Sequence, residues 1–199
     1  MKTFTITGYE FKELNSRAKQ KVRDWYLSDS ERSEMFEDAI NEYLRVNFPK
    51  SDLTVSFSLS SCQGDGLNIK GVLYLHDFIE FWHASEKEKK TIEFYLNNSI
   101  NEYAFETNNR YCYSCKFIDR KYIDYTISDF ISELQDRNIK NIKTDLIKLF
   151  FNKVLDFFEK LDATYEKEGY NYFYNVDETE IQEMCEANDY FFDIDGNLI

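Results

Sequence analysis

The four cysteines are the first side chains to consider for chemistry, because thiolates bind zinc. Cys112 and Cys115 form the only C-x-x-C spacing, and Cys62 and Cys185 could nominally complete a four-thiolate set. A zinc ion needs its sulfur ligands on one side, whereas an offset of three residues on a strand points two side chains to opposite faces. Because the Cys112 pair lies in a strand-like stretch, we expect reduced structural thiols and no metal site.

Histidine and glycine motifs offer little for catalysis. His76 and His83 are the only histidines, so a Ser-His-Asp arrangement or a histidine metal cluster has little material to work with. The sequence has no Gly-rich phosphate loop of the Walker or Rossmann type. We therefore predict that the protein is not an enzyme and needs no cofactor.

Carboxylates are concentrated in residues 156–199. This segment holds thirteen Asp or Glu against only Lys160 and Lys167, which gives it −11 of the net charge of −13. Such a surface repels phosphates, so direct nucleic-acid binding is not expected. Carboxylates interleaved with tyrosines could instead present spaced negative charge, like a nucleic-acid backbone, to a basic partner. The residues expected to contact such a partner are Asp162, Glu166, Glu168, Asp177, Glu178, Glu180, Glu183, Glu186, Tyr170 and Tyr172.

Asp193 and Asp195 stand two residues apart in the segment Phe192–Ile199. This segment resembles the first motif of haloacid-dehalogenase-type phosphatases, in which the leading Asp is the phosphoryl-accepting nucleophile and the second Asp an acid/base. Those enzymes need a parallel sheet and further motifs downstream, and Asn197 stands where the family usually has Thr. We therefore expect a strand followed by an Asp-Gly turn instead of a phosphatase site.

Apolar residues at four-residue spacing predict the helices that must position these side chains. Pro49 ends the second helix, because the residue before proline avoids helical geometry. Ser85 and Glu88 form a capping box that opens the third helix, and Gly169 is expected to stop the long fourth one. The apolar stripes of these four helices run over residues 14–26, 36–48, 92–103 and 142–165, and a helical pattern also returns at Ser128.

Alternation of apolar and polar residues predicts the strands. Two half-buried strands, 53–59 and 67–75, are joined by Ser61–Gly66, whose two glycines permit a hairpin turn. Gln63 and Asp65 in this turn are further candidates for contact with a partner. The remaining expected strands are 3–6, the antiparallel pair 111–117 and 122–127, and 170–174.

Together these elements predict an α+β fold, with antiparallel hairpins in the middle of the chain, helices on either side and one long C-terminal helix. We expect a single domain over residues 1–199, with 156–199 as an acidic C-terminal sub-region in which Asp177 and Glu180 cap a short helix. No segment approaches the roughly 20 apolar residues that a membrane helix requires. The expected protein is cytoplasmic, has no membrane contact and is a monomer or a weak dimer.

Two short patches resemble small uncharacterised proteins of phages and mobile elements. One is Ser58–Lys70, with its Cys62-Gln63-Gly64-Asp65-Gly66 core, and the other is Glu186–Gly196. The resemblance implies a phage or mobile-element origin and no known activity.

Three classes of function fit the sequence. The first is a phage-encoded inhibitor of a host nucleic-acid-dependent defence complex, of the anti-CRISPR or antirestriction type. It would bind a basic host protein or ribonucleoprotein through its acidic surface, and this binding would weaken as salt increases. The second is a regulatory or adaptor module that binds a protein through an apolar patch. The third is an enzyme without a recognisable motif, which would require a concave pocket with convergent titratable groups.

Overall fold

The structure is a computed structural model that describes residues 7–28, 30–59, 66–107, 117–118 and 122–199. Several predicted features lie outside these residues. They are the strand 3–6, the hairpin turn with Gln63 and Asp65, the Cys112 pair with Cys62, and most of the strand 111–117.

The chain divides into two compact units. Unit 1 comprises Met1–Phe36 and Glu168–Ile199, and unit 2 comprises Glu37–Lys167. Two long helices, α2 and α6, each supply residues to both units. The acidic segment 156–199 is therefore shared between the units, and its last 32 residues belong to unit 1.

A small sheet forms the centre of unit 2. Its strand order is β1-β2-β3-β4; the first three strands are antiparallel and β4 runs parallel to β3. The predicted first hairpin is confirmed, because β1 pairs with β2 from Asp52↔Val72 to Ser58↔Gly66. The strands are β1 (Asp52–Ser58), β2 (Gly66–Tyr74), β3 (Glu102–Glu106) and β4 (Phe117–Ile118). The fold class is α+β, as predicted.

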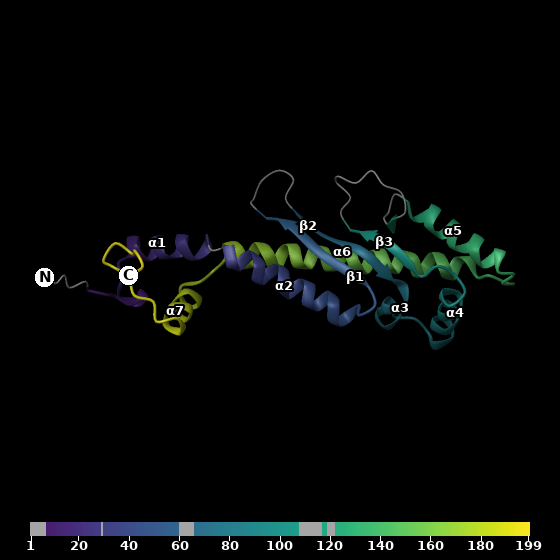
Figure 1. The fold of residues 1–199 in the computed structure, drawn as a ribbon, viewed down its shortest axis with the longest axis horizontal. Helices are drawn as coiled ribbons and strands as arrows, with labels where there is room; N and C mark the ends of the chain where they lie inside the picture. Colours follow the sequence, from purple (N-terminus) through teal and green to yellow (C-terminus); the bar gives the residue numbers. More distant parts are fainter. Residues whose placement is uncertain (1–6, 29, 60–65, 108–116, 119–121) are drawn as a thin grey trace, which may run out of the picture. The chain divides into compact units, whose positions relative to one another are not determined.

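Apolar residues on alternate positions of the strands bury one face of this sheet against α6. Leu67, Ile69 and Leu73 of β2 are fully buried, and Phe105 of β3 packs on Phe158 of α6 with ring centroids 4.6 Å apart. Figure 1 shows the strands lying over α6. The helices of unit 2, two of them shared with unit 1, are α2 (Ser30–Asn47), α3 (Leu75–Phe78), α4 (Glu86–Leu96), α5 (Ile123–Asp136) and α6 (Thr144–Tyr174), and η2 (Ile79–Phe81) is a short 3-10 helix.

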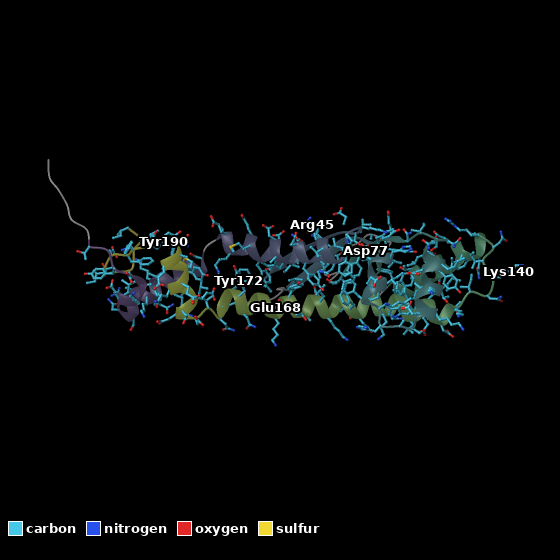
Figure 2. The ribbon with its side chains drawn as sticks, turned by 90° about the horizontal axis from the view of Figure 1, so that it is seen from below. Arg45, Asp77, Lys140, Glu168, Tyr172 and Tyr190 are labelled. Atoms are coloured by element: carbon cyan, nitrogen blue, oxygen red, sulfur yellow. The ribbon has the colours of Figure 1, made fainter. Side chains whose placement is uncertain are left out.

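Two predicted helix boundaries in unit 2 are confirmed, the start of α4 and the end of α2 before Pro49. Ser85 and Glu88 form the reciprocal capping box that opens α4. After α2 ends at Asn47, Pro49 is followed by a turn that Asp77 holds: its Oδ2 accepts hydrogen bonds from Lys50 N, Ser51 N and Ser51 Oγ, each 2.9 Å long. Figure 2 labels Asp77 at this place.

Three predicted elements are wrong. Tyr103 lies in β3 instead of extending a helix, because α4 ends at Leu96 and the alternation of Tyr103 and Phe105 then places Phe105 in the core. The expected strand 122–127 is the start of α5, whose buried positions recur with helical spacing up to Leu134.

The third wrong prediction concerns the end of α6. The helix continues through Gly169 to Tyr174, so 170–174 is not a strand. Gly169 costs a helix interior about 1 kcal/mol, which packing offsets. Tyr172 and Phe173 contact Phe36 of α2, with ring centroids 5.6 and 5.4 Å away, and Tyr170 stacks on Tyr174 one turn later. Tertiary contacts therefore outweigh both the glycine and the strand preference of the aromatic residues.

Removing the Asp77 carboxylate tests its role in unit 2. We expect Asp77→Ala to lower the free energy of unfolding by about 2 kcal/mol, because two backbone N–H groups and one hydroxyl lose a charged acceptor. Urea unfolding measures this change. Glu80→Ala, which removes an exposed carboxylate from η2, is the matched control and should leave the stability within about 0.5 kcal/mol. Equal effects of the two substitutions would contradict the assignment.

Candidate functional sites

The predicted partner-binding carboxylates are divided between the two units. Asp162 lies in unit 2, is only 9% exposed, and its Oδ1 accepts a hydrogen bond of 3.0 Å from Thr107 Oγ1. Glu166 lies on the same helix of unit 2 and is half-buried. The carboxylate of Asp162 thus joins α6 to the end of β3. Because it is buried, it is not part of the exposed acidic surface.

The short helix α7 (Glu178–Ala187) carries most of the other predicted residues. Asp177 caps it as expected, since its side chain accepts a hydrogen bond of 2.8 Å from Glu180 N. Ile181 and Cys185 face the core of unit 1, and Glu183 and Glu186 are exposed. The spacing of these two carboxylates is fixed by a capped helix with a buried apolar side.

A basic helix in unit 1 neutralises part of this charge. It is α1 (Ser16–Leu27), which carries four basic residues against Asp24 alone. Lys19 Nζ of this helix lies 2.8 Å from Glu178 Oε2. Unit 1 as a whole contains fifteen acidic and seven basic residues, so a large acidic excess remains. The sequence did not reveal the ion pair between Lys19 and Glu178, because α1 and α7 are far apart in the chain.

Arg32 of α2 also forms an ion pair with α7. Its side chain is 5% exposed, and its guanidinium lies between the rings of Tyr26 and Tyr172, 4.2 Å from each centroid. Nη1 lies 3.4 Å from Glu180 Oε1, and Nη2 donates a hydrogen bond of 2.5 Å to the Tyr172 carbonyl. Arg32 therefore binds α7 and the end of α6 at once through charge, hydrogen bonds and cation–π contacts.

Tyr26 completes this cluster, which we call the Arg32 cluster (Tyr26, Arg32, Tyr172 and Glu180). Its hydroxyl donates a hydrogen bond of 2.9 Å to Glu180 Oε1. Burial and the hydrogen bond to Glu180 raise the pKa of Tyr26 above its ordinary value, although Arg32 opposes the shift. The hydroxyl is therefore protonated at neutral pH and acts as a donor. Glu180 and Tyr172, both predicted to contact a partner, have structural roles within unit 1.

The carboxylates left over are exposed and form no ion pair with any described residue. Among them Glu168 lies one helical turn before Tyr172 near the end of α6 (Figure 2). Glu186 accepts a hydrogen bond from Gln182, and its charge interacts with Lys12 without a direct ion pair. We call this group the outer carboxylates: Glu168, Glu183, Glu186, Asp189 and Asp195. The last two were not among the predicted residues.

The segment around Asp193 is a turn. Asp193 Oδ1 accepts hydrogen bonds from Asp195 N and Asn197 N, at 2.9 and 2.8 Å, and its Oδ2 accepts one from Asn197 Nδ2 at 2.7 Å. These bonds lower the pKa of Asp193. Gly196 has φ +79°, and a Cβ there would lie 2.6 Å from the Ala18 carbonyl oxygen, so only glycine fits. The predicted Asp-Gly turn is confirmed, preceded by single bridges from Phe192 to Tyr9 and Leu198 in place of a full strand.

The described part of the chain contains no group of three or more His, Cys, Asp or Glu that could hold a metal ion. Cys185 is buried in unit 1, and burial, with a smaller contribution from Glu186, raises the pKa of its thiol to about 11. His76 is stacked on Tyr74, and its Nε2 lies 3.1 Å from Asn97 Oδ1.

Unit 2 contains a groove that the sequence did not reveal. Its volume is about 560 Å³, and it lies between β3 and α5. Tyrosine rings and carboxylates line it together, which is the kind of concave site that the third class of function requires. The lining residues that matter most are Ile100, Glu102, Tyr103, Tyr125, Asp129 and Glu133.

Comparison with known proteins adds no assignment, since no protein-family model, curated protein or solved structure matches the chain. Among the described residues, no helix combines the length and apolar character needed to cross a membrane.

A pair of alanine substitutions on α7 tests the Arg32 cluster. We expect Glu180→Ala to lower the free energy of unfolding by about 2 kcal/mol, because it leaves the buried Arg32 charge without its carboxylate. Glu183→Ala, three residues further along the same helix, should change it by less than about 0.5 kcal/mol. Chemical denaturation of both variants gives the comparison, and a loss for Glu180→Ala no larger than the control's would contradict the role of the cluster.

Alkylation tests the environment of Cys185. With a pKa of about 11, the thiol is almost entirely protonated at pH 8, and burial limits access to it. We expect iodoacetamide to modify the peptide that carries Cys185 much more slowly in the native protein than in urea, as measured by mass spectrometry. Equal rates in the two conditions would show that the thiol is exposed.

Proposed function

We propose that the protein is a phage-encoded inhibitor of a host nucleic-acid-dependent defence complex, of the anti-CRISPR or antirestriction type. In this proposal it acts in the bacterial cytoplasm and occupies a basic nucleic-acid groove of a host protein or ribonucleoprotein. The observation that carries the proposal is the set of outer carboxylates, which are exposed and form no ion pair with a described residue, although α1 and Arg32 neutralise their neighbours.

The mode of binding follows from how these carboxylates are held. Glu183 and Glu186 project from α7. Asp177 caps the N-terminus of this helix, and Arg32 holds the helix through its ion pair with Glu180. Carboxylates on a rigid element bind a row of Lys and Arg without the entropy loss of ordering a flexible tail. Residues 168–199 contain nine acidic and no basic residues, so this segment offers a basic groove no repulsive contact.

The proposal assigns different roles to residues that the sequence treated alike. Glu168, Glu183 and Glu186 contact the partner, whereas Glu178 and Glu180 hold α7 in place through Lys19 and Arg32. Substitutions in the two groups should therefore have separable effects. The first group should change binding, and the second should change stability.

Charge reversal tests the proposal. The variant Glu168→Lys, Glu183→Lys, Glu186→Lys is expected to lose a partner that the wild-type protein captures from a low-GC bacterial lysate. Binding of the wild type should also weaken strongly between low and physiological salt, because exposed charges are screened. Quantitative mass spectrometry of the captured proteins gives both results.

The matched control reverses three exposed carboxylates of unit 2, with the variant Glu86→Lys, Glu93→Lys, Asp136→Lys. It changes the net charge by the same amount and should retain the partner. Equal loss of the partner in both triple variants would show that binding depends on net charge and not on the position of the carboxylates. Capture that does not depend on salt or on the unit 1 carboxylates would contradict mimicry and favour an adaptor that binds through an apolar patch.

A further inference from the structure

The groove in unit 2 lies beside β3, which pairs with β4 over two residues of the described chain. Parallel pairing with β4 involves Ala104 and Phe105 of β3, and the groove continues along the strand from Ala104 to Ile100. Its other wall is α5, from which Tyr125, Asp129 and Glu133 contribute. The volume of about 560 Å³ lies within the range of about 300–1,000 Å³ typical of small-molecule sites.

One aromatic ring of the groove is packed against the core of unit 2. The ring of Tyr103 is held edge-on against Phe151 of α6, with centroids 5.8 Å apart and planes at 90°. Burial raises the pKa of Tyr103, and the nearby Glu133 and Asp129 carboxylates raise it further, so the phenol is neutral. At the rim Tyr125 is 72% exposed and Ile100 is 50% exposed, which leaves both available to cover a bound molecule.

The charged side chains that line the groove, among the residues the structure describes, are all carboxylates. Glu102, Asp129 and Glu133 line the groove, and none of its lining residues in the described part of the chain is Lys, Arg or His. Glu133 Oε2 accepts a hydrogen bond of 2.8 Å from Ile100 N, while Glu102 and Asp129 have no hydrogen-bond or ion-pair partner for their side chains among the described residues. Aromatic rings beside unpaired carboxylates favour a ligand that is positively charged and has an apolar body.

We propose that the groove between β3 and α5 binds a small organic cation, an amine or a guanidine, with its apolar body on Tyr103 and Tyr125 and its charge at Glu102 and Asp129. The volume of the groove fits a small molecule, and the carboxylates that line it favour a positively charged ligand. The outer carboxylates of unit 1 take no part in this site, so either proposal can fail without the other.

Three probes with the same phenyl ring test the charge preference in the full-length protein. They are phenethylamine, which is a cation at neutral pH, the neutral 2-phenylethanol and the anion phenylacetate. We expect the cation to bind about tenfold tighter than the alcohol, and phenylacetate not to bind. Titration by nuclear magnetic resonance gives the affinities, and the shifted amides should lie in β3 and α5. Equal binding of the cation and the alcohol would overturn the proposal.

Two substitutions on the same helix locate the charge. Asp129→Asn should weaken phenethylamine binding about fivefold and leave 2-phenylethanol unchanged, whereas Asp136→Asn, an exposed residue of α5 outside the groove, should change neither. Tyr125→Ala should weaken both probes. All three positions are exposed, so folding is not at stake. Equal losses of phenethylamine affinity in Asp129→Asn and Asp136→Asn would overturn the assignment. It would also be overturned if the groove bound a lysine-containing peptide but did not bind phenethylamine.

Discussion

The structure of unit 1 depends on one buried cation. Arg32 is stacked between two tyrosine rings and reaches both a carboxylate of α7 and a carbonyl at the end of α6. A buried charge that loses its partner destabilises a protein strongly, so the position of α7 is tied to this residue. Arg32, together with the buried Ile181 and Cys185, therefore holds the helix that carries the exposed carboxylates Glu183 and Glu186.

The carboxylates of the C-terminal segment fall into two groups. Some carboxylates make contacts within the folded protein. Asp162 accepts a hydrogen bond from Thr107, and Glu178 forms an ion pair with Lys19. The remainder stay in solvent and give unit 1 its acidic excess. The two groups differ in burial and in their contacts, and the net charge of the segment does not distinguish them. The groove of unit 2 follows the same logic, because its significance comes from the placement of carboxylates beside tyrosine rings.

Local signals predicted the parts of the fold that local physics determines. The hairpin of β1 and β2, the capping box at Ser85 and the cap at Asp177 are correct because each depends on neighbouring residues. The continuation of α6 through Gly169 was not predictable, since it depends on packing against Phe36. Arg32 and the groove were missed for the same reason: their partners lie far away in the sequence, and no local pattern marks them.

The central claim is that carboxylates held in fixed places by unit 1 stand in for nucleic-acid phosphates. The most direct measurement is competition, in which short duplex DNA or RNA is added to the complex of the wild-type protein with its captured partner. We expect the nucleic acid to displace the protein in proportion to its concentration, at constant ionic strength. A complex that survives saturating nucleic acid, or that binds both at once, would contradict it.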